Sequence, residues 1–234
     1  MNVVLDIQDL SKSFDGLNLF YEASFSLEGR SLNSLFGGNG TGKTTLFNMI
    51  TGFDNPDSGS ITFLGENVFN YKSYQLAQMG IGKLWQNPTI FPNHTLLENL
   101  LISNKNNRSE SFFGFLNIGD KSINDRQFLG VAESVLRKLG LFEKRNVLAG
   151  SISYGQTKLL GLGMLLCNKP SLYLLDEPFS NIGTKTIDVM CESLRDVAKQ
   201  GGTILMIEHK TTIAKSLSDN IYRIDNHKIE LITE

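Results

Sequence analysis

The sequence predicts an α/β protein with a mostly parallel sheet. Apolar strand-like segments alternate with helix-like segments along the 234 residues, which is the order that βαβ units produce. Residues 172–175 are apolar at every position, which is typical of a strand buried on both faces. A glycine-rich turn at residues 37–42 joins an apolar run to a helix-like stretch. The length allows one large domain or a core with a subdomain.

The first third of the chain is predicted to be rich in strands. Strands are expected at residues 3–7, 23–27 and 60–64, because the second and third alternate apolar and polar positions. A helix is expected at residues 45–50, ended by Gly52. Turn-forming residues at 54–59 separate this helix from the third strand.

The rest of the chain is predicted to alternate helices and strands after an irregular stretch. Residues 103–127 are expected to form a loop or a short helix pair at a surface, in which Phe112, Phe113 and Phe115 are either a contact patch or local core. The expected helices are 128–139, 159–167, 184–197 and 213–217, the expected strands are 172–175 and 203–207, and a hairpin follows through 225–227.

Composition excludes several functional classes. The net charge of −2 shows no basic excess, so we expect no nucleic-acid partner. No apolar run approaches the ~20 residues that cross a bilayer, and the N-terminus lacks the pattern of a signal peptide. If the protein serves a membrane, another chain is therefore expected to span it. Cys167 and Cys191 lack metal-site spacing and are expected to be buried thiols in a reducing cytosol.

The glycine-rich turn fits the pattern G-x-x-x-x-G-K-[ST]. The matching residues are Gly37, Gly38, Asn39, Gly40, Thr41, Gly42, Lys43 and Thr44, followed by Thr45. Glycines let backbone N–H groups approach phosphate oxygens, and the following helix directs its positive end toward them. Lys43 would reach the β- and γ-phosphates, and the Thr44 hydroxyl would bind Mg²⁺. The sequence therefore predicts a nucleoside triphosphate site; the alternative is a glycine-rich turn without a ligand.

Two carboxylates follow the buried strand at residues 172–175. Burying an unpaired carboxylate is costly, so Asp176 and Glu177 are expected to have partners or a function. Beside a phosphate-binding loop, Asp176 would support Mg²⁺ directly or through water. Glu177 would orient and polarise the water that attacks the γ-phosphate. Together with the loop, this pair predicts hydrolysis of ATP or GTP.

Three further stretches narrow the class: residues 85–92, 153–156 and 204–209. Taken alone, Gln86 could be a surface amide, Ser153 a helix N-cap and His209 the end of a strand. In this order around this loop, the stretches resemble the nucleotide-binding subunits of ABC transporters over essentially the whole chain. The resemblance implies a P-loop NTPase core with a mostly parallel sheet, an antiparallel β subdomain and an inserted α-helical subdomain. Residues 1–234 would form one domain, with the core at 1–86 and 151–234 and the helical subdomain at about 87–150.

The resemblance also implies roles for individual residues. Residues 37–45 match the Walker A loop, Asp176 the Walker B aspartate and Glu177 the catalytic glutamate. Gln86 matches the glutamine that contacts Mg²⁺ and the attacking water, and His209 the histidine that contacts the γ-phosphate. Phe14 matches the aromatic residue that stacks on adenine, although ordinary core packing is the alternative. The signature motif of the family is matched by Ser153, Tyr154, Gly155 and Gln156.

The resemblance implies partners as well. In this family the signature motif closes over ATP bound by a second subunit, so a head-to-tail homo- or heterodimer holding ATP and Mg²⁺ is expected. Integral-membrane permease subunits are the other expected partners, docked on a groove within residues 87–116, which places the protein peripherally on the cytoplasmic face of the membrane. Details of the sequence are similar to the ATPases of branched-chain amino-acid and urea importers. The alternatives are an ABC export system and a soluble ABC ATPase such as one of iron–sulfur assembly.

Two positions depart from the family pattern. Leu159 stands where most members have an arginine, and Gly183 stands where an aspartate usually helps to couple the two ATP sites. Glu177 and His209 are present, so hydrolysis is still expected.

Overall fold

The computed structural model describes residues 2–14, 16–105 and 123–232. The chain forms two compact units, each containing segments that are distant in sequence. The first unit comprises Met1–Gln86, Pro170–Ser180 and Leu194–Glu234, and the second comprises Asn87–Lys169 and Asn181–Ser193. The patch of Phe112, Phe113 and Phe115 and most of the irregular stretch at 103–127 lie outside the described residues.

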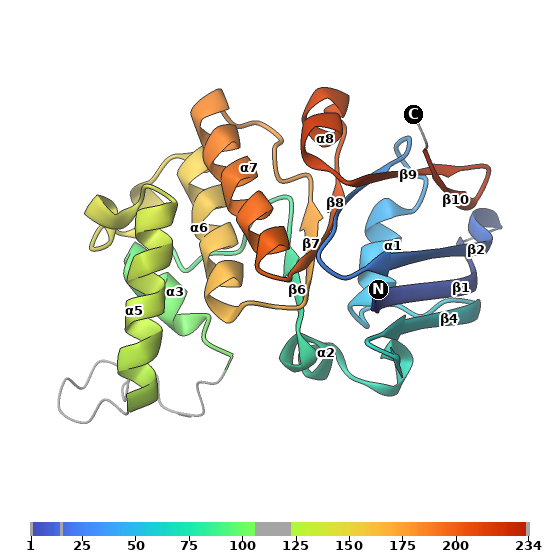
Figure 1. Cartoon of the computed structure of the whole chain (residues 1–234), viewed down its shortest axis with the longest axis horizontal. Coiled ribbons are helices and arrows are strands. Elements are labelled where there is room, and N and C mark those ends of the chain that lie inside the picture. The colour runs from blue at the N-terminus through green and yellow to red at the C-terminus, as the bar shows by residue number, and fades with distance from the viewer. Residues whose placement is uncertain (1, 15, 106–122, 233–234) are drawn as a thin grey trace. The chain divides into compact units, whose positions relative to one another are not determined.

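A six-stranded, mostly parallel sheet forms the centre of the first unit (Figure 1). Its order is β10-β9-β3-β8-β7-β6, with β3 at Leu32–Phe36, β6 at Ile81–Leu84, β7 at Leu172–Asp176, β8 at Thr203–Ile207, β9 at Asn220–Asp225 and β10 at Lys228–Leu231. Strands β9, β3, β8, β7 and β6 pair in parallel, whereas β10 pairs with β9 in an antiparallel hairpin. Every residue of β7 and β8 is buried, as a parallel strand covered on both faces requires. The predicted fold class is confirmed.

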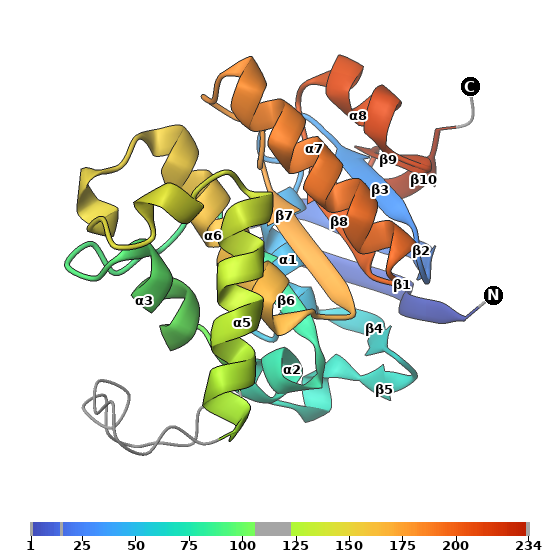
Figure 2. The same ribbon diagram turned by 60° about the vertical axis from the view of Figure 1, so that its left-hand side comes forward.

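A second, antiparallel sheet belongs to the same unit and has the order β2-β1-β4-β5. Its strands are β1 Val3–Phe14, β2 Leu17–Glu28, β4 Ser58–Phe63 and β5 Glu66–Asn67, and they lie beside one another in Figures 1 and 2. The expected strands at 3–7 and 23–27 are therefore too short. Register shifts interrupt the pairing of β1 with β2 at four places, so the alternation that predicts a strand breaks within each.

Helix α1 (Lys43–Ile50) joins the two sheets through one apolar core. Leu46, Phe47, Met49 and Ile50 are buried on α1 and cluster with residues of β1, β2 and β4 and with residues of β3, β7 and β8. Helix α1, and with it the loop that precedes the helix, is thereby held between the two sheets. Helix α2 (Ser73–Met79) and helix α8 (Thr211–Leu217) also belong to this unit.

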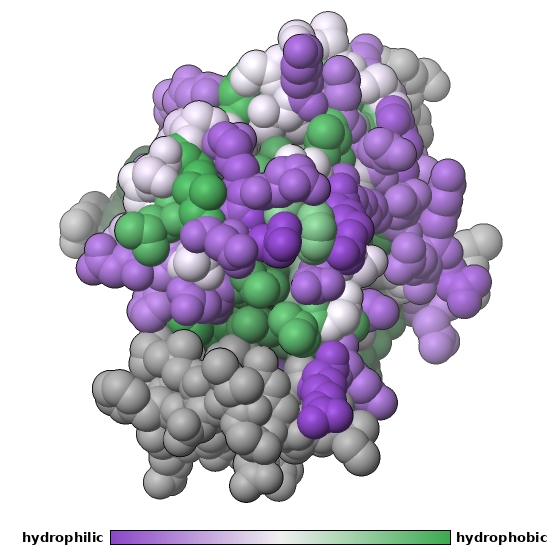
Figure 3. Space-filling model, turned by 90° about the vertical axis from the view of Figure 1, so that its left-hand side faces the viewer, coloured by the Kyte–Doolittle hydropathy of each residue, from purple (hydrophilic) through white to green (hydrophobic). Residues whose placement is uncertain are grey.

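The second unit is helical. It is built from α3 (Leu96–Ile102), α5 (Ile123–Lys138) and α6 (Tyr154–Asn168), with short 3₁₀ turns at Phe142–Lys144 and Ala149–Ser151. Each of these three helices contacts the other two. Gly163 allows α6 to pack closely against the residues at the end of α5, because a Cβ at Gly163 would lie 3.0 Å from Leu139 Cδ1. Helix α7 (Thr184–Lys199) supplies residues to both units. Figure 3 shows hydrophilic and hydrophobic residues interspersed over the coloured part of one face of the chain.

The sequence prediction does not include α2, α3 or β6. Each is short, with seven residues in α2, seven in α3 and four in β6, so the pattern repeats about twice at most and cannot be distinguished from chance. The other predicted helices and strands are present, with ends that differ by a few residues.

Candidate active site

The glycine-rich loop leads from β3 into α1. Lys43 is the first residue of α1, and its N-cap is Gly42, which has no side chain with which to cap the helix. The first N–H groups of an α-helix have no partner within the helix, and the helix dipole adds a partial positive charge there. This end of α1 therefore presents uncapped N–H groups and favours an anion.

Two glycines of the loop, Gly40 and Gly42, have a positive φ. Gly42 has φ +96°, and a Cβ at this position would lie 2.9 Å from Phe20 Cε2 and 3.2 Å from Leu19 Cβ. Gly40 has φ +80°, but a Cβ there would meet nothing within 4 Å. Both positions favour glycine by conformation, whereas Gly42 alone of the two also needs it for space.

A pocket of about 250 Å³ opens above this loop. It is lined by Leu19, Asn39, Gly40, Gly42, Lys43, Thr44, Thr45, Asp176, Glu177, Ile207 and His209. The structure therefore brings the predicted phosphate loop, the two predicted carboxylates and the predicted histidine to one cavity. They meet because β3, β7 and β8 are neighbouring parallel strands, whose carboxyl ends lie at the same edge of the sheet.

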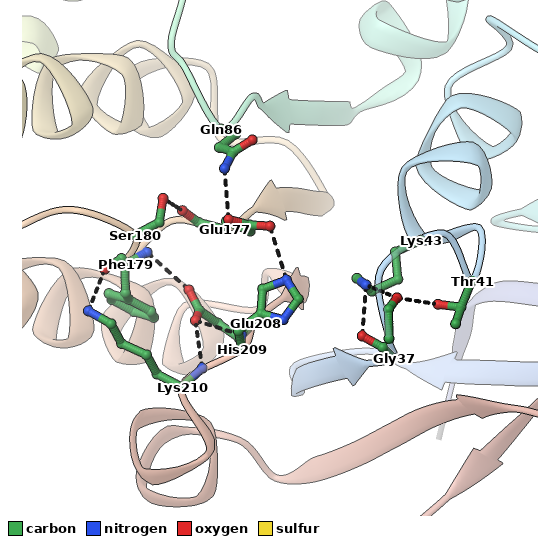
Figure 4. Close-up of polar contacts among 11 residues, drawn as sticks. Gly37, Thr41, Lys43, Gln86, Glu177, Phe179, Ser180, Glu208, His209 and Lys210 are labelled. Atoms are coloured by element: carbon green, nitrogen blue, oxygen red, sulfur yellow. Dashed lines mark hydrogen bonds and ion pairs between the residues drawn. The ribbon is translucent and has the colours of Figure 1, made fainter.

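Lys43 is folded back onto its own loop (Figure 4). Its Nζ donates hydrogen bonds to the carbonyl oxygens of Gly37 and Gly38, both at 2.8 Å. Burial lowers the pKa of Lys43, and the nearby carboxylates of Glu177 and Asp176 act in the opposite direction. To reach a phosphate as expected, the ammonium group would exchange these carbonyl contacts for phosphate oxygens.

Both carboxylate oxygens of Glu177 are engaged. His209 Nε2 lies 3.0 Å from Oε1, and Gln86 Nε2 donates to Oε2 at 2.8 Å (Figure 4). Glu177 also has φ +46°, a conformation that is uncommon for a residue with a side chain and that occurs at functional sites. The three residues predicted to be catalytic thus form one hydrogen-bonded group.

The oxygen ligands in the pocket fit Mg²⁺. Thr44 supplies a hydroxyl and Asp176 a carboxylate, and both line the cavity beside the loop. Within the described part of the chain, no three His, Cys, Asp or Glu side chains gather into a cluster that could hold a metal ion by themselves. Mg²⁺ is commonly bound by one or two protein oxygens with waters and substrate phosphates, so this sparse set is sufficient. Gln86, the third expected metal ligand, directs its amide nitrogen to Glu177.

Phe14, the residue expected to stack on a base, ends β1 and is 47% exposed. Lys12 Nζ lies 4.7 Å from the centroid of its ring and also contacts Asp54 at 3.0 Å. An exposed ring with a fixed cation beside it differs from core packing, which was the alternative for this residue. The geometry is compatible with a stacking surface.

The four signature residues belong to the second unit and start α6. Ser153 is the N-cap, and its hydroxyl and the Gln156 side chain exchange hydrogen bonds with each other's backbone N–H in a capping box. The Tyr154 hydroxyl donates to Asn87 Oδ1 at 3.0 Å. A Cβ at Gly155 would lie 3.1 Å from Thr186 Oγ1, so a larger residue would press on α7. The N-cap interpretation of Ser153 is confirmed, which does not exclude a second role.

No role in the site was predicted from the sequence for two charged residues near the pocket, Lys83 and Glu208. Lys83, on β6, places Nζ 3.5 Å from the centroid of the Trp85 ring and donates to Asn48 Oδ1 at 3.0 Å; burial lowers its pKa to about 8, opposed by the Asp176 carboxylate. Glu208 follows β8 and is 2% exposed. The signal for Glu208 was present, because it follows five apolar or small residues of a buried strand just as Asp176 and Glu177 do.

These features are those of a P-loop nucleoside triphosphatase, and the comparison with known families identifies the family. Residues 20–180 match the family described as "ABC transporter", so the chain belongs to this family and is an ATP-binding, ATP-hydrolysing transporter subunit. Among curated proteins it is 31% identical to the high-affinity branched-chain amino acid transport ATP-binding protein LivG of Salmonella typhimurium, over 95% of this chain and 88% of that protein. It is 29% identical to the protein of the same description, BraF, of Pseudomonas aeruginosa, again over 95% and 88%.

The solved structures agree with this assignment. A crystal structure of the ADP conformation of an ATP-binding cassette of an ABC transporter superposes with a TM-score of 0.81 at 27% identity, covering 98% of this chain and 90% of that one. In the part of the chain that the structure describes, every helix is too short or too polar to cross a membrane.

Proposed function

We propose that this ATPase drives an importer of branched-chain amino acids, urea or a related small polar solute. The similarity to LivG and BraF over nearly the whole chain supports import of this class of solute. The pocket that combines the glycine-rich loop with Asp176, Glu177 and His209 supports the mechanism by which it is powered.

In this mechanism the loop and α1 bind the triphosphate. The N–H groups at the start of α1 contact phosphate oxygens, and Lys43 transfers its hydrogen bonds from the carbonyls of Gly37 and Gly38 to the β- and γ-phosphates. Thr44 and Asp176 are the residues that would hold Mg²⁺, whose charge would offset that of the phosphates. Phe14 provides the surface on which adenine stacks.

Glu177 acts on the attacking water. Its carboxylate accepts the proton or orients the water, and it is held between Gln86 and His209 before nucleotide binds. For the water to reach Oε1 or Oε2, at least one of these two contacts opens. Gln86 and His209 then face the ATP side of the pocket, where they contact the water and the γ-phosphate.

The active form is a head-to-tail pair. Ser153, Tyr154, Gly155 and Gln156 would close over ATP held by a second copy or a paralogue. Helix α6 has 15 residues and begins at this motif, so its N–H groups and dipole supply a favourable end for a γ-phosphate. Gly183, in place of the usual aspartate, is expected to weaken coupling between the two sites.

The permease is the other partner. The helical subdomain at about 87–150 would receive a short cytoplasmic helix of the permease, as in helix-in-groove recognition. This docking places the protein at the cytoplasmic face of the membrane. Residues 106–116 of the expected groove lie outside the described residues. Cysteine cross-linking from single positions in 87–105 to permease loops should succeed, and cross-linking solely from 180–234 would contradict the docking site.

The mechanism is tested by Glu177→Gln. The amide keeps the shape but removes the carboxylate, so steady-state ATP turnover should fall by about 100-fold or more while binding of a fluorescent ATP analogue is retained. Glu133→Gln, on α5, is the matched control, because Glu133 contacts Arg137 on the surface of the second unit. Turnover of Glu177→Gln within about twofold of wild type would refute the assigned role.

The solute is tested by transport. Assembled with its permease, the chain should support ATP-dependent uptake of labelled leucine or urea. Export of a preloaded solute, or no solute movement with intact ATPase activity, would contradict an importer.

A further inference from the structure

A buried carboxylate beside the active-site histidine connects two loops of the pocket. Glu208 is 2% exposed and follows the last residue of β8. Its Oε1 accepts a hydrogen bond from the backbone N–H of Phe179 at 3.0 Å. Its Oε2 accepts from the backbone N–H groups of His209 at 3.1 Å and Lys210 at 3.3 Å (Figure 4). One carboxylate thus contacts the loop after β7 with one oxygen and the loop after β8 with the other.

A second side chain repeats the connection in the opposite direction. Lys210 Nζ donates to the carbonyl oxygen of Phe179 at 2.9 Å, so both peptide groups of Phe179 are held by the loop after β8. The N–H of Glu177 in turn donates to the carbonyl oxygen of Ile207 at 3.1 Å. Hydrogen bonds at Glu177 and at Phe179 therefore link the loop after β7 to the residues on either side of His209.

We propose that Glu208 is a positioning residue for ATP hydrolysis, which holds Glu177 and His209 at the 3.0 Å separation of their side chains. This inference rests on the catalytic roles proposed above for those two residues. The carboxylate of Glu208 is buried and accepts hydrogen bonds from three backbone N–H groups, so we assign it no contact with the substrate or the reacting water. It acts through the loops whose N–H groups it binds.

The chemistry of the contact explains why glutamate serves here. An ionised carboxylate only accepts hydrogen bonds, and each of its two oxygens can accept more than one. Glutamine offers one accepting oxygen, and its NH₂ group would face either the N–H of Phe179 or the N–H groups of His209 and Lys210. Burying the charge is costly unless it is hydrogen-bonded, and the three backbone donors supply charge-assisted bonds that offset the cost.

The test is Glu208→Gln in the full chain. Turnover should fall by about tenfold or more, because a displacement of catalytic groups by about 1 Å has effects of that order, while the affinity for a fluorescent ATP analogue stays within about twofold. A loss of affinity and turnover together would indicate a merely structural role and overturn the inference. Unchanged turnover would overturn it as well.

A double-mutant cycle with His209→Ala locates the effect. If Glu208 acts by positioning His209 and Glu177, Glu208→Gln should lower turnover much less in the His209→Ala background than in wild type. Full additivity would refute this. If Glu208→Gln does not fold, Lys210→Met tests the same link with an exposed side chain, and it should lower turnover in the same direction without changing ATP affinity.

The control separates this inference from the proposed mechanism. Asp219→Asn alters another carboxylate that accepts a backbone N–H, from Leu32 at 2.8 Å, at the opposite end of the parallel strands, and it should leave turnover unchanged. If Glu177→Gln and His209→Ala leave turnover intact, the proposed mechanism fails. If both lower turnover but Glu208→Gln does not, the positioning role alone fails.

Discussion

Gly42→Ala should destabilise the first unit more than Gly40→Ala, even without nucleotide. Both substitutions place alanine at a positive φ, +96° and +80°, which costs about 1–2 kcal/mol. At Gly42 the new Cβ would also lie 2.9 and 3.0 Å from ring carbons of Phe20, which is 1% exposed and therefore confined. Overpacking of this kind costs about 1–3 kcal/mol. Alanine also restricts the unfolded chain, which returns about 0.4–1 kcal/mol at both positions.

The expected loss of unfolding free energy is therefore about 3 kcal/mol for Gly42→Ala and about 1 kcal/mol for Gly40→Ala. Urea unfolding measures both. Trp85 is the one tryptophan of the chain and lies in the same unit as the loop, so its fluorescence reports the unit in question. Measurement without nucleotide ensures that contacts with phosphate do not contribute.

Equal losses for the two variants, within about 0.5 kcal/mol, would show that the contact with Phe20 does not matter and would refute the reasoning. Phe20→Leu provides an internal check, because it removes the ring atoms that the new Cβ approaches. It should cost less stability in the Gly42→Ala background than in wild type, whereas its cost should be unchanged in the Gly40→Ala background.

Two further predictions concern Lys83 and Ser153. The pKa of Lys83 is about 8 in the folded chain and 10.5 as the ordinary value, so between these values the unfolded chain binds more protons and stability rises with pH. From about pH 7.5 to about 9.5 these two pKa values correspond to a gain of about 1.8 kcal/mol, which solvent screening of this partly exposed side chain reduces to about 1 kcal/mol. Wild type should gain this unfolding free energy relative to Lys83→Met in urea titrations, and a constant difference would contradict the prediction. Ser153→Ala removes the capping hydroxyl of α6 and should lower the melting temperature by about 2–4 °C by circular dichroism. Ser153→Asn should restore most of the lost melting temperature, because asparagine also caps helices well. Equal melting temperatures of the Ser153→Ala and Ser153→Asn variants would refute the capping role of Ser153.

Much of the fold could be predicted, because most strands and helices show their period. The strands at 3–14 and 17–28 could not be predicted at full length. Asp9 and Glu22 have φ of 49° and 45°, which coincide with shifts in pairing between β1 and β2. Such irregularities move the side chains that follow onto the other face, so the pattern of alternation breaks while the strand continues.

The short helices illustrate a different limit. Helix α3 has seven residues, too few to distinguish a helical period from chance. Its start nevertheless carries a local signal, because Thr95 and Glu98 form a capping box in which each side chain accepts from the other's backbone N–H. That pair was visible in the sequence and could have placed the helix.

The parts of the site that could be predicted are those formed by consecutive residues. The loop at 37–45 and the pair Asp176–Glu177 follow local patterns, and the pocket contains members of both. The contact of Gln86 with Glu177 spans 91 residues of sequence and depends on the sheet order. The lowered pKa of Lys83 could not be predicted either, because it results from burial in the folded chain, which no local sequence pattern describes.

The position of β3 has a consequence for how the chain is made. Its two neighbours in the sheet are β8 and β9, which begin at Thr203 and Asn220, so β3 leaves the ribosome about 170 residues before either partner exists. Until then its apolar residues and both of its edges are unpaired, which is the situation that favours aggregation. The phosphate loop, which directly follows β3, therefore acquires its final support only when nearly the whole chain has been synthesised. Truncation before Thr203 should accordingly leave a chain that cannot bind ATP, however intact its glycine-rich loop.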